Sequence, residues 1–214
     1  MIQNNFTVFE NQSAYEAGTA DIIARNNRVG VGALPTSRLV PRTQFATAEN
    51  IDILVGGMLK GMDNARQLNM SDNRVAFGIY KVTPANTPDS KNATSANPAW
   101  RIALWHVIVE GGWEQGFPEE DIEAIQAYVR KGLEGLSDIL PSQACYTNEA
   151  DYGEKDWQNI FFGDHYERLL RIKRRYDPTT LFNCWKCIGW LGAEDPMYSC
   201  YGNDAKPSAL VEGL

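Results

Sequence analysis

The sequence is poor in histidine and lacks the short motifs by which many enzymes are recognised. It has two histidines among 214 residues, His106 and His165, which disfavours histidine-rich metal sites and most catalytic triads. It contains no glycine-rich dinucleotide fingerprint, no phosphate-binding loop, no HExxH zinc motif and no GxSxG nucleophile elbow. The common nucleotide-dependent and hydrolytic classes therefore find no support in these motifs.

An excess of positive charge and long apolar runs are also missing. Asp and Glu total 27 against 20 Lys and Arg, for a net charge of −7, so we expect no nucleic-acid partner. No apolar run approaches the roughly 20 residues of a membrane-spanning helix, and we expect no membrane partner. Residues 1–10 lack the basic and apolar regions of a signal peptide, so we expect no export signal within this chain.

Two features nevertheless favour a secreted parent protein. N-x-[ST] sequons, the acceptor pattern for N-glycosylation of secreted proteins, begin at Asn5, Asn11, Asn69 and Asn92. Cysteines gather near the C-terminus, as an oxidising compartment permits. We expect that the parent carries the leader that is missing here.

The cysteines leave several kinds of site open. Cys184-Trp-Lys-Cys187 forms a CxxC pair, with Cys145 before it and Cys200 after it. The second CxxC of a strong zinc signal is absent, and the pair is expected in coil rather than at the helix N-terminus that suits a redox dithiol. A disulfide is favoured over inert thiols and over a zinc or redox site. Four cysteines allow three pairings, and the sequence does not choose among them.

Hydrophobic periodicity predicts a mixture of helices and strands. Helices are expected at 13–26, at 49–67, from 118 through Leu136, and from 164 until Asp177-Pro178. Strands are expected at 74–80 and at 101–110, the second ended by Gly111-Gly112. Residues 29–42, with two prolines and two glycines, are expected to be loop or short extended pieces, and 83–98 a surface loop. The predicted fold class is α+β, an antiparallel sheet with helices packed on one face.

One candidate acid or base lies on the second predicted strand. Alternation puts His106 at the centre of one face, with Trp100, Leu104 and Ile108, while Arg101, Trp105 and Val107 take the other face. His106 is the titrating group near the strand centre, and imidazole changes charge near neutral pH. The alternative is a core histidine with satisfied hydrogen bonds.

An ordered set of residues between Cys145 and Phe182 carries the most information. It comprises Tyr146-x-Asn148, an acidic turn, Asp156-Trp-Gln158, Phe161-Phe-Gly163, Tyr166-x-Arg-Leu169, Ile172-Lys173, Tyr176-Asp-Pro178 and Leu181-Phe182. This pattern resembles the C-terminal module of the berberine-bridge-enzyme-like FAD-linked oxidoreductases, of fungal type, in the vanillyl-alcohol-oxidase superfamily. Upstream, Ser37–Arg42 and Asn97–Trp105 resemble the substrate domain of the fungal members. The resemblance covers residues 10–200.

The resemblance implies an organisation and a cofactor. Residues 1–140 would be a partial substrate-binding domain, 141–202 the berberine-type C-terminal module and 203–214 a loose tail. FAD would be held mostly by an N-terminal flavin domain that is absent from this chain and would be its partner. The chain alone would then be inactive.

The resemblance also assigns roles to two residues. The family's Tyr-x-Asn matches Tyr146 and Asn148, so Asn148 would hydrogen-bond to flavin or substrate and Tyr146 would face the reacting carbon. Hydride transfer from a small organic substrate to flavin, with O₂ as the acceptor, needs a base near the substrate's proton. The alternative for these two residues is a core tyrosine and a turn-capping asparagine. The alternative for the chain is a stand-alone non-catalytic domain, a split-gene or pseudoenzyme product, that binds a small molecule or a protein partner.

Two departures qualify the match. Where the family reads Gly-x-Asn-Tyr, this chain has Gly163-Asp-His165-Tyr166, which puts that asparagine's hydrogen bond in doubt. The tail from Cys184 to Tyr201 fits a fungal subgroup, which favours oxidation of a fungal secondary metabolite or a carbohydrate over alkaloid ring closure.

Overall fold

A small antiparallel sheet forms the centre of the molecule. The computed structural model describes residues 7–26, 30–66, 75–81, 94–194 and 196–198. The strands are β1 (Val31–Pro41), β2 (Val75–Tyr80) and β3 (Ala103–Glu114), in the order β1-β3-β2. The helices are α1 (Gln12–Asn26), α2 (Ala48–Arg66), α3 (Glu119–Ser137), α4 (Trp157–Phe162) and α5 (Tyr166–Tyr176). None of these helices is long and apolar enough to cross a membrane.

The main core lies between the sheet and the helices α2 and α3, which confirms the predicted α+β class. Strand alternation turns Val107 and Val109 of β3 toward the helices, and both are almost fully buried. Helix α3 meets them with the apolar side predicted from its period, namely Ile125, Val129, Leu133 and Leu136. The opposite face of the sheet stays free of α2 and α3 and is available for a site.

The segment predicted as loop or short extended pieces is one continuous strand, β1. Eleven residues pair antiparallel with β3 in a register that places Leu39 opposite His106. Proline cannot donate to a strand ladder, so it is confined to edge strands and bulges. Pro35 lies on β1, which is an edge strand, and Pro41 follows a register shift after Val40. The prolines therefore mark the edge of the sheet rather than a loop.

Strand β3 also differs from its predicted bounds. It begins at Ala103, after a 3-10 turn at Pro98–Arg101, and it continues through Gly111-Gly112 to Glu114. Gly111 lies within the strand at a point where α3 passes too close for a side chain. A Cβ there would lie 2.5 Å from Ile125 Cγ2 and 2.7 Å from Val129 Cγ2. The glycine is required by packing and is not a strand terminator. The predicted loop at 83–98 lies mostly outside the described residues.

The predicted apolar stripe on α2 is only partly buried. Leu54 is fully buried, but Ile51, Val55 and Leu59 are 40%, 44% and 54% exposed. The contact with α3 runs instead through glycines. A Cβ on Gly61 would lie 2.1 Å from the Gly132 carbonyl oxygen, and one on Gly57 would lie 2.5 Å from the Gly135 carbonyl oxygen. The two helix backbones therefore touch, which shifts the buried line of α2 away from its apolar stripe.

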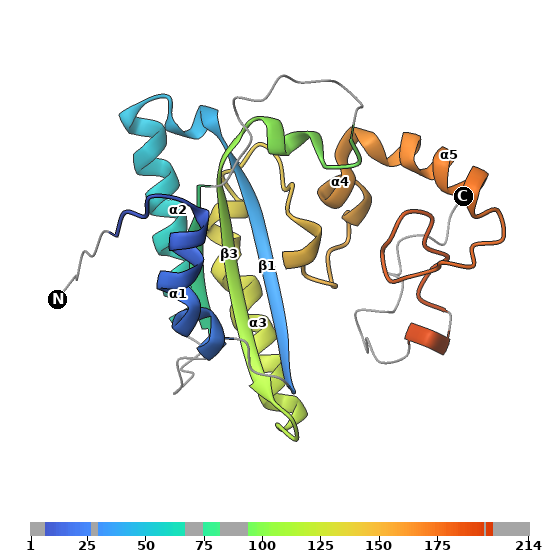
Figure 1. Cartoon of the computed structure of the whole chain (residues 1–214), viewed down its shortest axis with the longest axis horizontal. Helices are drawn as coiled ribbons and strands as arrows, with labels where there is room; N and C mark the ends of the chain where they lie inside the picture. Colours follow the sequence, from blue (N-terminus) through green and yellow to red (C-terminus); the bar gives the residue numbers. More distant parts are fainter. Residues whose placement is uncertain (1–6, 27–29, 67–74, 82–93, 195, 199–214) are drawn as a thin grey trace.

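The C-terminal part of the chain crosses the outer edge of β1 and forms a second core. Leu39 donates its backbone N–H to the Ala144 carbonyl at 2.8 Å, and Tyr146 N–H donates to Ser37 Oγ at 3.2 Å. Beyond this crossing, Cys145, Trp157, Ile160 and Phe161 pack together, with Tyr166 and Trp190 against them. In Figure 1, α4 and α5 lie on the other side of β1 from α1 and α2. The edge strand thus joins the two cores.

The glycine contact predicts opposite effects for one substitution at two positions of α2. Gly61→Ala should lower the free energy of unfolding by about 1–3 kcal/mol, because its methyl group forces α2 away from α3. Gly56→Ala, whose Cβ would meet nothing within 4 Å, should be neutral or raise it by about 0.5–1 kcal/mol through helix propensity. Urea unfolding of both variants measures the difference, and equal shifts would contradict the close helix contact.

Candidate functional site

A cavity of about 590 Å³ opens on the face of the sheet opposite to α2 and α3. His106 and Ile108 of β3 form its floor, since they alternate with Val107 and Val109, which face the helices. Its other walls come from separate parts of the chain: Tyr80 at the end of β2, Trp100 and Arg101 from the 3-10 turn, and Tyr146 and Glu149 from the C-terminal part. The cavity is therefore built where the C-terminal part meets the sheet.

Three aromatic rings, those of Trp100, Tyr146 and Tyr80, lie edge to face or tilted against the His106 ring. Ring centroids are 5.3 Å apart for Trp100 and His106, 5.5 Å for Trp100 and Tyr146, and 5.8 Å for His106 and Tyr146. Tyr80, paired with His106 across the ladder, lies at 6.3 Å. Such contacts orient aromatic rings as well as burying them. The predicted residues His106 and Tyr146 are thus brought together, although they lie far apart in the sequence.

The turn that carries Trp100 is tied to the second core. Asn97 Oδ1 accepts the Ala99 N–H at 3.0 Å, and Asn97 Nδ2 donates to the Ile160 carbonyl at 3.0 Å. The same turn places Arg101 at the cavity, whereas strand alternation had put Arg101 on the opposite face from His106. That prediction is wrong because β3 begins only at Ala103, so the alternation does not extend back to Arg101.

Asn148 is held by Tyr146. Its Nδ2 donates to Tyr146 Oη at 2.9 Å, so the phenol oxygen acts as the acceptor and its own proton is left for another acceptor. Asn148 Oδ1 accepts no hydrogen bond from the residues that the structure describes. The side chain is exposed. The predicted pair is therefore assembled, with one amide oxygen and one phenol proton open to a ligand.

His106 is held in its neutral form by its surroundings. The residue is 4% exposed, and burial lowers its pKa from the usual value, because desolvation disfavours the charged imidazolium. Its Nε2 is buried without a hydrogen-bond partner among the described residues. An unpaired buried polar atom is costly and calls for an explanation. A neutral imidazole in this position can accept a proton.

Glu149 is a site residue that the sequence did not reveal. It is half-buried at the cavity wall, and burial raises its pKa, with the nearby charge of Glu110 acting in the same direction. Its Oε2 has no hydrogen-bond partner in the described part of the chain. Its place directly after the Tyr-x-Asn pattern was the signal available, but only the tertiary structure turns it toward His106's side of the sheet.

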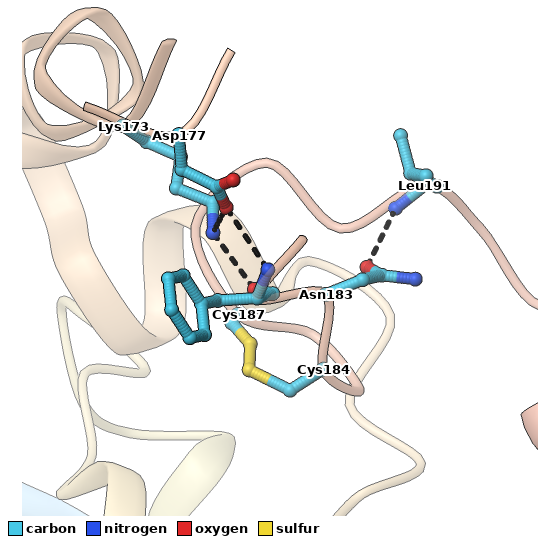
Figure 2. The surroundings of a disulfide bond; sticks show 7 residues. Lys173, Asp177, Asn183, Cys184, Cys187 and Leu191 are labelled. Atoms are coloured by element: carbon cyan, nitrogen blue, oxygen red, sulfur yellow. Dashed lines mark hydrogen bonds and ion pairs between the residues drawn. A yellow bond between two sulfur atoms is a disulfide. The ribbon is translucent and has the colours of Figure 1, made fainter. Parts of the chain in front are cut away.

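The CxxC pair forms a disulfide, the kind of site favoured from the sequence, which had left the pairing open. Cys184 and Cys187 are bonded, and Figure 2 shows the loop fixed to the end of α5 through Lys173 and Asp177. Cys145 is a buried free thiol, and burial raises its pKa to about 12, so it does not supply a thiolate near neutral pH. Cys200 lies outside the described residues. Among those described, no three His, Cys, Asp or Glu side chains gather as metal ligands.

His165, which stands where the resembled pattern has asparagine, is buried. Its Nδ1 has no hydrogen-bond partner among the residues described. The structure therefore shows no bond at this atom that would replace the one expected of the asparagine.

Comparison with known proteins identifies the relatives of this chain. Residues 145–188 match the family model "Berberine and berberine like". FAD-linked oxidoreductase cheF of Chaetomium globosum is 28% identical over 94% of this chain and 32% of its own length. VAO-type flavoprotein oxidase VAO615 of Thermothelomyces thermophilus is 35% identical over 68% of this chain and 24% of its own length.

A solved structure agrees with these sequence matches. The VAO-type flavoprotein MtVAO615 from Myceliophthora thermophila superimposes with a TM-score of 0.58 at 25% identity, over 73% of this chain and 27% of that one. The chain thus spans about a third or less of the length of these relatives. It belongs to the berberine-bridge-enzyme-like family of FAD-linked oxidoreductases, in the vanillyl-alcohol-oxidase superfamily.

Proposed function

We propose that this chain forms the substrate-binding and acid–base side of an FAD-dependent oxidase that takes a hydride from a small organic molecule and uses O₂ as its acceptor. The observation that carries the proposal is the cavity in which His106, Tyr146 and Glu149 converge. A general base must lie within about 3 Å of the proton it removes. The cavity offers two candidate bases, His106 and Glu149, beside an aromatic wall. Family membership supplies the redox class.

The residues present fit a flavin. The cavity is walled by rings, and the Tyr146 hydroxyl at its wall has an open proton. Asn148 does not line the cavity itself, but it bonds to that hydroxyl and its own Oδ1 is open. We propose that Asn148 and Tyr146 contact the cofactor. When bound, FAD supplies the ring system that accepts the hydride and passes the electrons on. We infer that a separate flavin domain holds most of the cofactor, which agrees with the small share of each relative that this chain spans.

The proton chemistry belongs to the chain's own side chains. Loss of a hydride from a carbon leaves a proton to be removed from the neighbouring O–H or N–H group. Neutral His106 accepts that proton, and the Tyr146 hydroxyl, fixed by Asn148, lies against the reacting carbon. Glu149 offers a carboxyl oxygen without a partner among the described residues to a polar group of the substrate. Buried oxygens that lack partners favour a ligand that can donate hydrogen bonds.

The aromatic walls of the cavity indicate the class of substrate. Trp100, Tyr80 and Tyr146 favour a ring-containing substrate, such as a fungal secondary metabolite or a carbohydrate, since pockets of this kind combine apolar walls with a few polar groups.

We also propose that the parent protein is secreted, which the Cys184–Cys187 disulfide supports. The boundaries 1–140, 141–202 and 203–214 stay a prediction.

The test of the function uses the complete natural protein that contains this chain. It should purify with bound flavin, and a substrate should bleach the flavin's visible absorption under anaerobic conditions, with colour returning when O₂ is admitted. A protein that is colourless and stays colourless after FAD is added would instead support the non-catalytic binding domain.

Tyr146→Phe in that protein should slow anaerobic flavin reduction by roughly 10²-fold or more, because it removes the hydroxyl that lies against the reacting carbon, a loss as large as that of a positioned acid–base group. The flavin content should stay unchanged. Tyr128→Phe is the matched control, because Tyr128 lies on α3 and outside the cavity. Equal reduction rates in wild type and Tyr146→Phe would remove Tyr146 from the chemistry.

The lowered pKa of His106 predicts a pH dependence. The base is neutral above its pKa, so flavin reduction should be fast at neutral pH and should fall as pH decreases through a value below the usual 6.5. His106→Gln should be slow at every pH and should lose this acidic limb. Stopped-flow reduction across the acid range measures both curves. An acidic limb that persists in His106→Gln would assign it to another group, such as Glu149.

A further inference from the structure

The disulfide-closed loop is anchored firmly to the end of α5. Asp177 Oδ1 accepts the Leu181 N–H at 2.7 Å and Oδ2 accepts the Phe182 N–H at 3.1 Å, while Lys173 Nζ donates to the Phe182 carbonyl at 2.7 Å. Figure 2 shows this anchor beside the bond between Cys184 and Cys187. The loop that the disulfide closes is therefore held on a helix and presents its two middle residues in a fixed direction.

Those two middle residues, Trp185 and Lys186, donate hydrogen bonds to the turn at residues 151–154. Lys186 is only 6% exposed and has a left-handed backbone, with φ of 49°. Its Nζ donates to the Tyr152 carbonyl and, at 2.6 Å, to the Glu154 carbonyl. Trp185 Nε1 donates to the same Tyr152 carbonyl at 2.9 Å. A buried ammonium must be hydrogen-bonded, so these carbonyls are bound tightly to the loop.

The other side of the same turn is bonded to the sheet. Glu154 Oε1 lies 2.7 Å from Arg38 Nη1, and both side chains are largely buried, at 15% and 9% exposed. Arg38 belongs to β1 and donates through Nη1 to the Ser37 carbonyl at 2.8 Å and through Nε to Gln143 Oε1 at 2.9 Å. The turn thus connects the disulfide loop to β1 and to the residues just before Tyr146.

Tyr146 lies at the end of this series of bonds. Its N–H donates to Ser37 Oγ at 3.2 Å, and Gln143, three residues earlier, is the acceptor of Arg38 Nε. On its C-terminal side the chain passes through Glu149 to Asp151, which binds Arg130 Nε of α3 at 2.6 Å. The backbone that carries the Tyr146 ring is therefore held before, at and after the residue.

We propose that Lys186 is a positioning residue for Tyr146: through the 151–154 turn, the Glu154–Arg38 ion pair and Ser37, it fixes the Tyr146 ring against Trp100 and His106. The catalytic meaning of this role rests on the proposed function, but the positioning itself does not. The Cys184–Cys187 bond contributes to this positioning, because it closes the loop that holds Lys186 against the Tyr152 and Glu154 carbonyls. A thiol reductant would act at this loop, with two electrons and two protons converting the disulfide to two thiols as the reductant is oxidised.

The test reads the Tyr146 ring directly in the 214-residue chain, without flavin. Tyr146 is replaced by a fluorotyrosine and observed by fluorine NMR. Wild type should give one signal, shifted from that of the unfolded chain by the neighbouring rings. Lys186→Met, which keeps the apolar stem and removes the ammonium, should give several signals or one moved toward the unfolded position, and Lys186→Arg should restore most of the shift. Lys60→Met is the matched control, since Lys60 pairs with Asp138 on the exposed side of α2.

Glu154→Gln tests the middle of the connection and keeps the backbone carbonyl that Lys186 binds. It should change the Tyr146 signal as Lys186→Met does, and the double variant should change it no further. An unchanged Tyr146 signal in a folded Lys186→Met or Glu154→Gln chain, with thermal unfolding still cooperative, would overturn the proposal. If Lys186→Met does not fold, Glu154→Gln decides. An inactive wild-type enzyme would defeat the proposed function alone, since the ring measurement needs no turnover.

Discussion

The two faces of β3 are the constraint on which the rest of the molecule depends. β3 is hydrogen-bonded on both sides, to β1 and to β2, so its register fixes which side chains point each way. Val107 and Val109 face α3, and His106 and Ile108 face the cavity. A slip of one residue would exchange the two sets. The buried helix contact thus secures the register that exposes the site.

The cavity exists because a second core is attached to an edge of this sheet. The C-terminal part covers the open edge of β1 through the bond from Leu39 to Ala144, and it brings Tyr146 opposite His106. Unpaired strand edges are normally protected in some such way. Here the covering segment also carries Tyr146 and Glu149, so the same contact that protects the strand edge brings these site residues to the cavity.

Buried charge is concentrated at the junction of the two cores. Arg38 with Glu154, Lys186 with two carbonyls, and the buried Asp151 with the partly exposed Arg130 all meet around a single acidic turn. Buried ion pairs add little net stability, but removal of one partner is costly. Such groups therefore specify how the two cores fit together more than they strengthen either one. The aromatic contacts around Trp100 and Trp157 supply the apolar part of the same junction.

The sequence by itself determined the elements whose apolar period matches their buried face. Helix α3 follows the pattern predicted for it, and β2 follows it in part, since Val75 and Phe77 pack against the core while Ile79 is 47% exposed. The ordered matches from Tyr146 to Phe182 identified the family because they depend only on order and spacing. The prediction was wrong where packing overrides local preference. β1 is a strand despite Pro35, and β3 runs through Gly111, because an edge position and a close helix make those residues fit. Glu149 and Arg101 joined His106 only through the tertiary structure, since no local pattern records which loops meet above a strand.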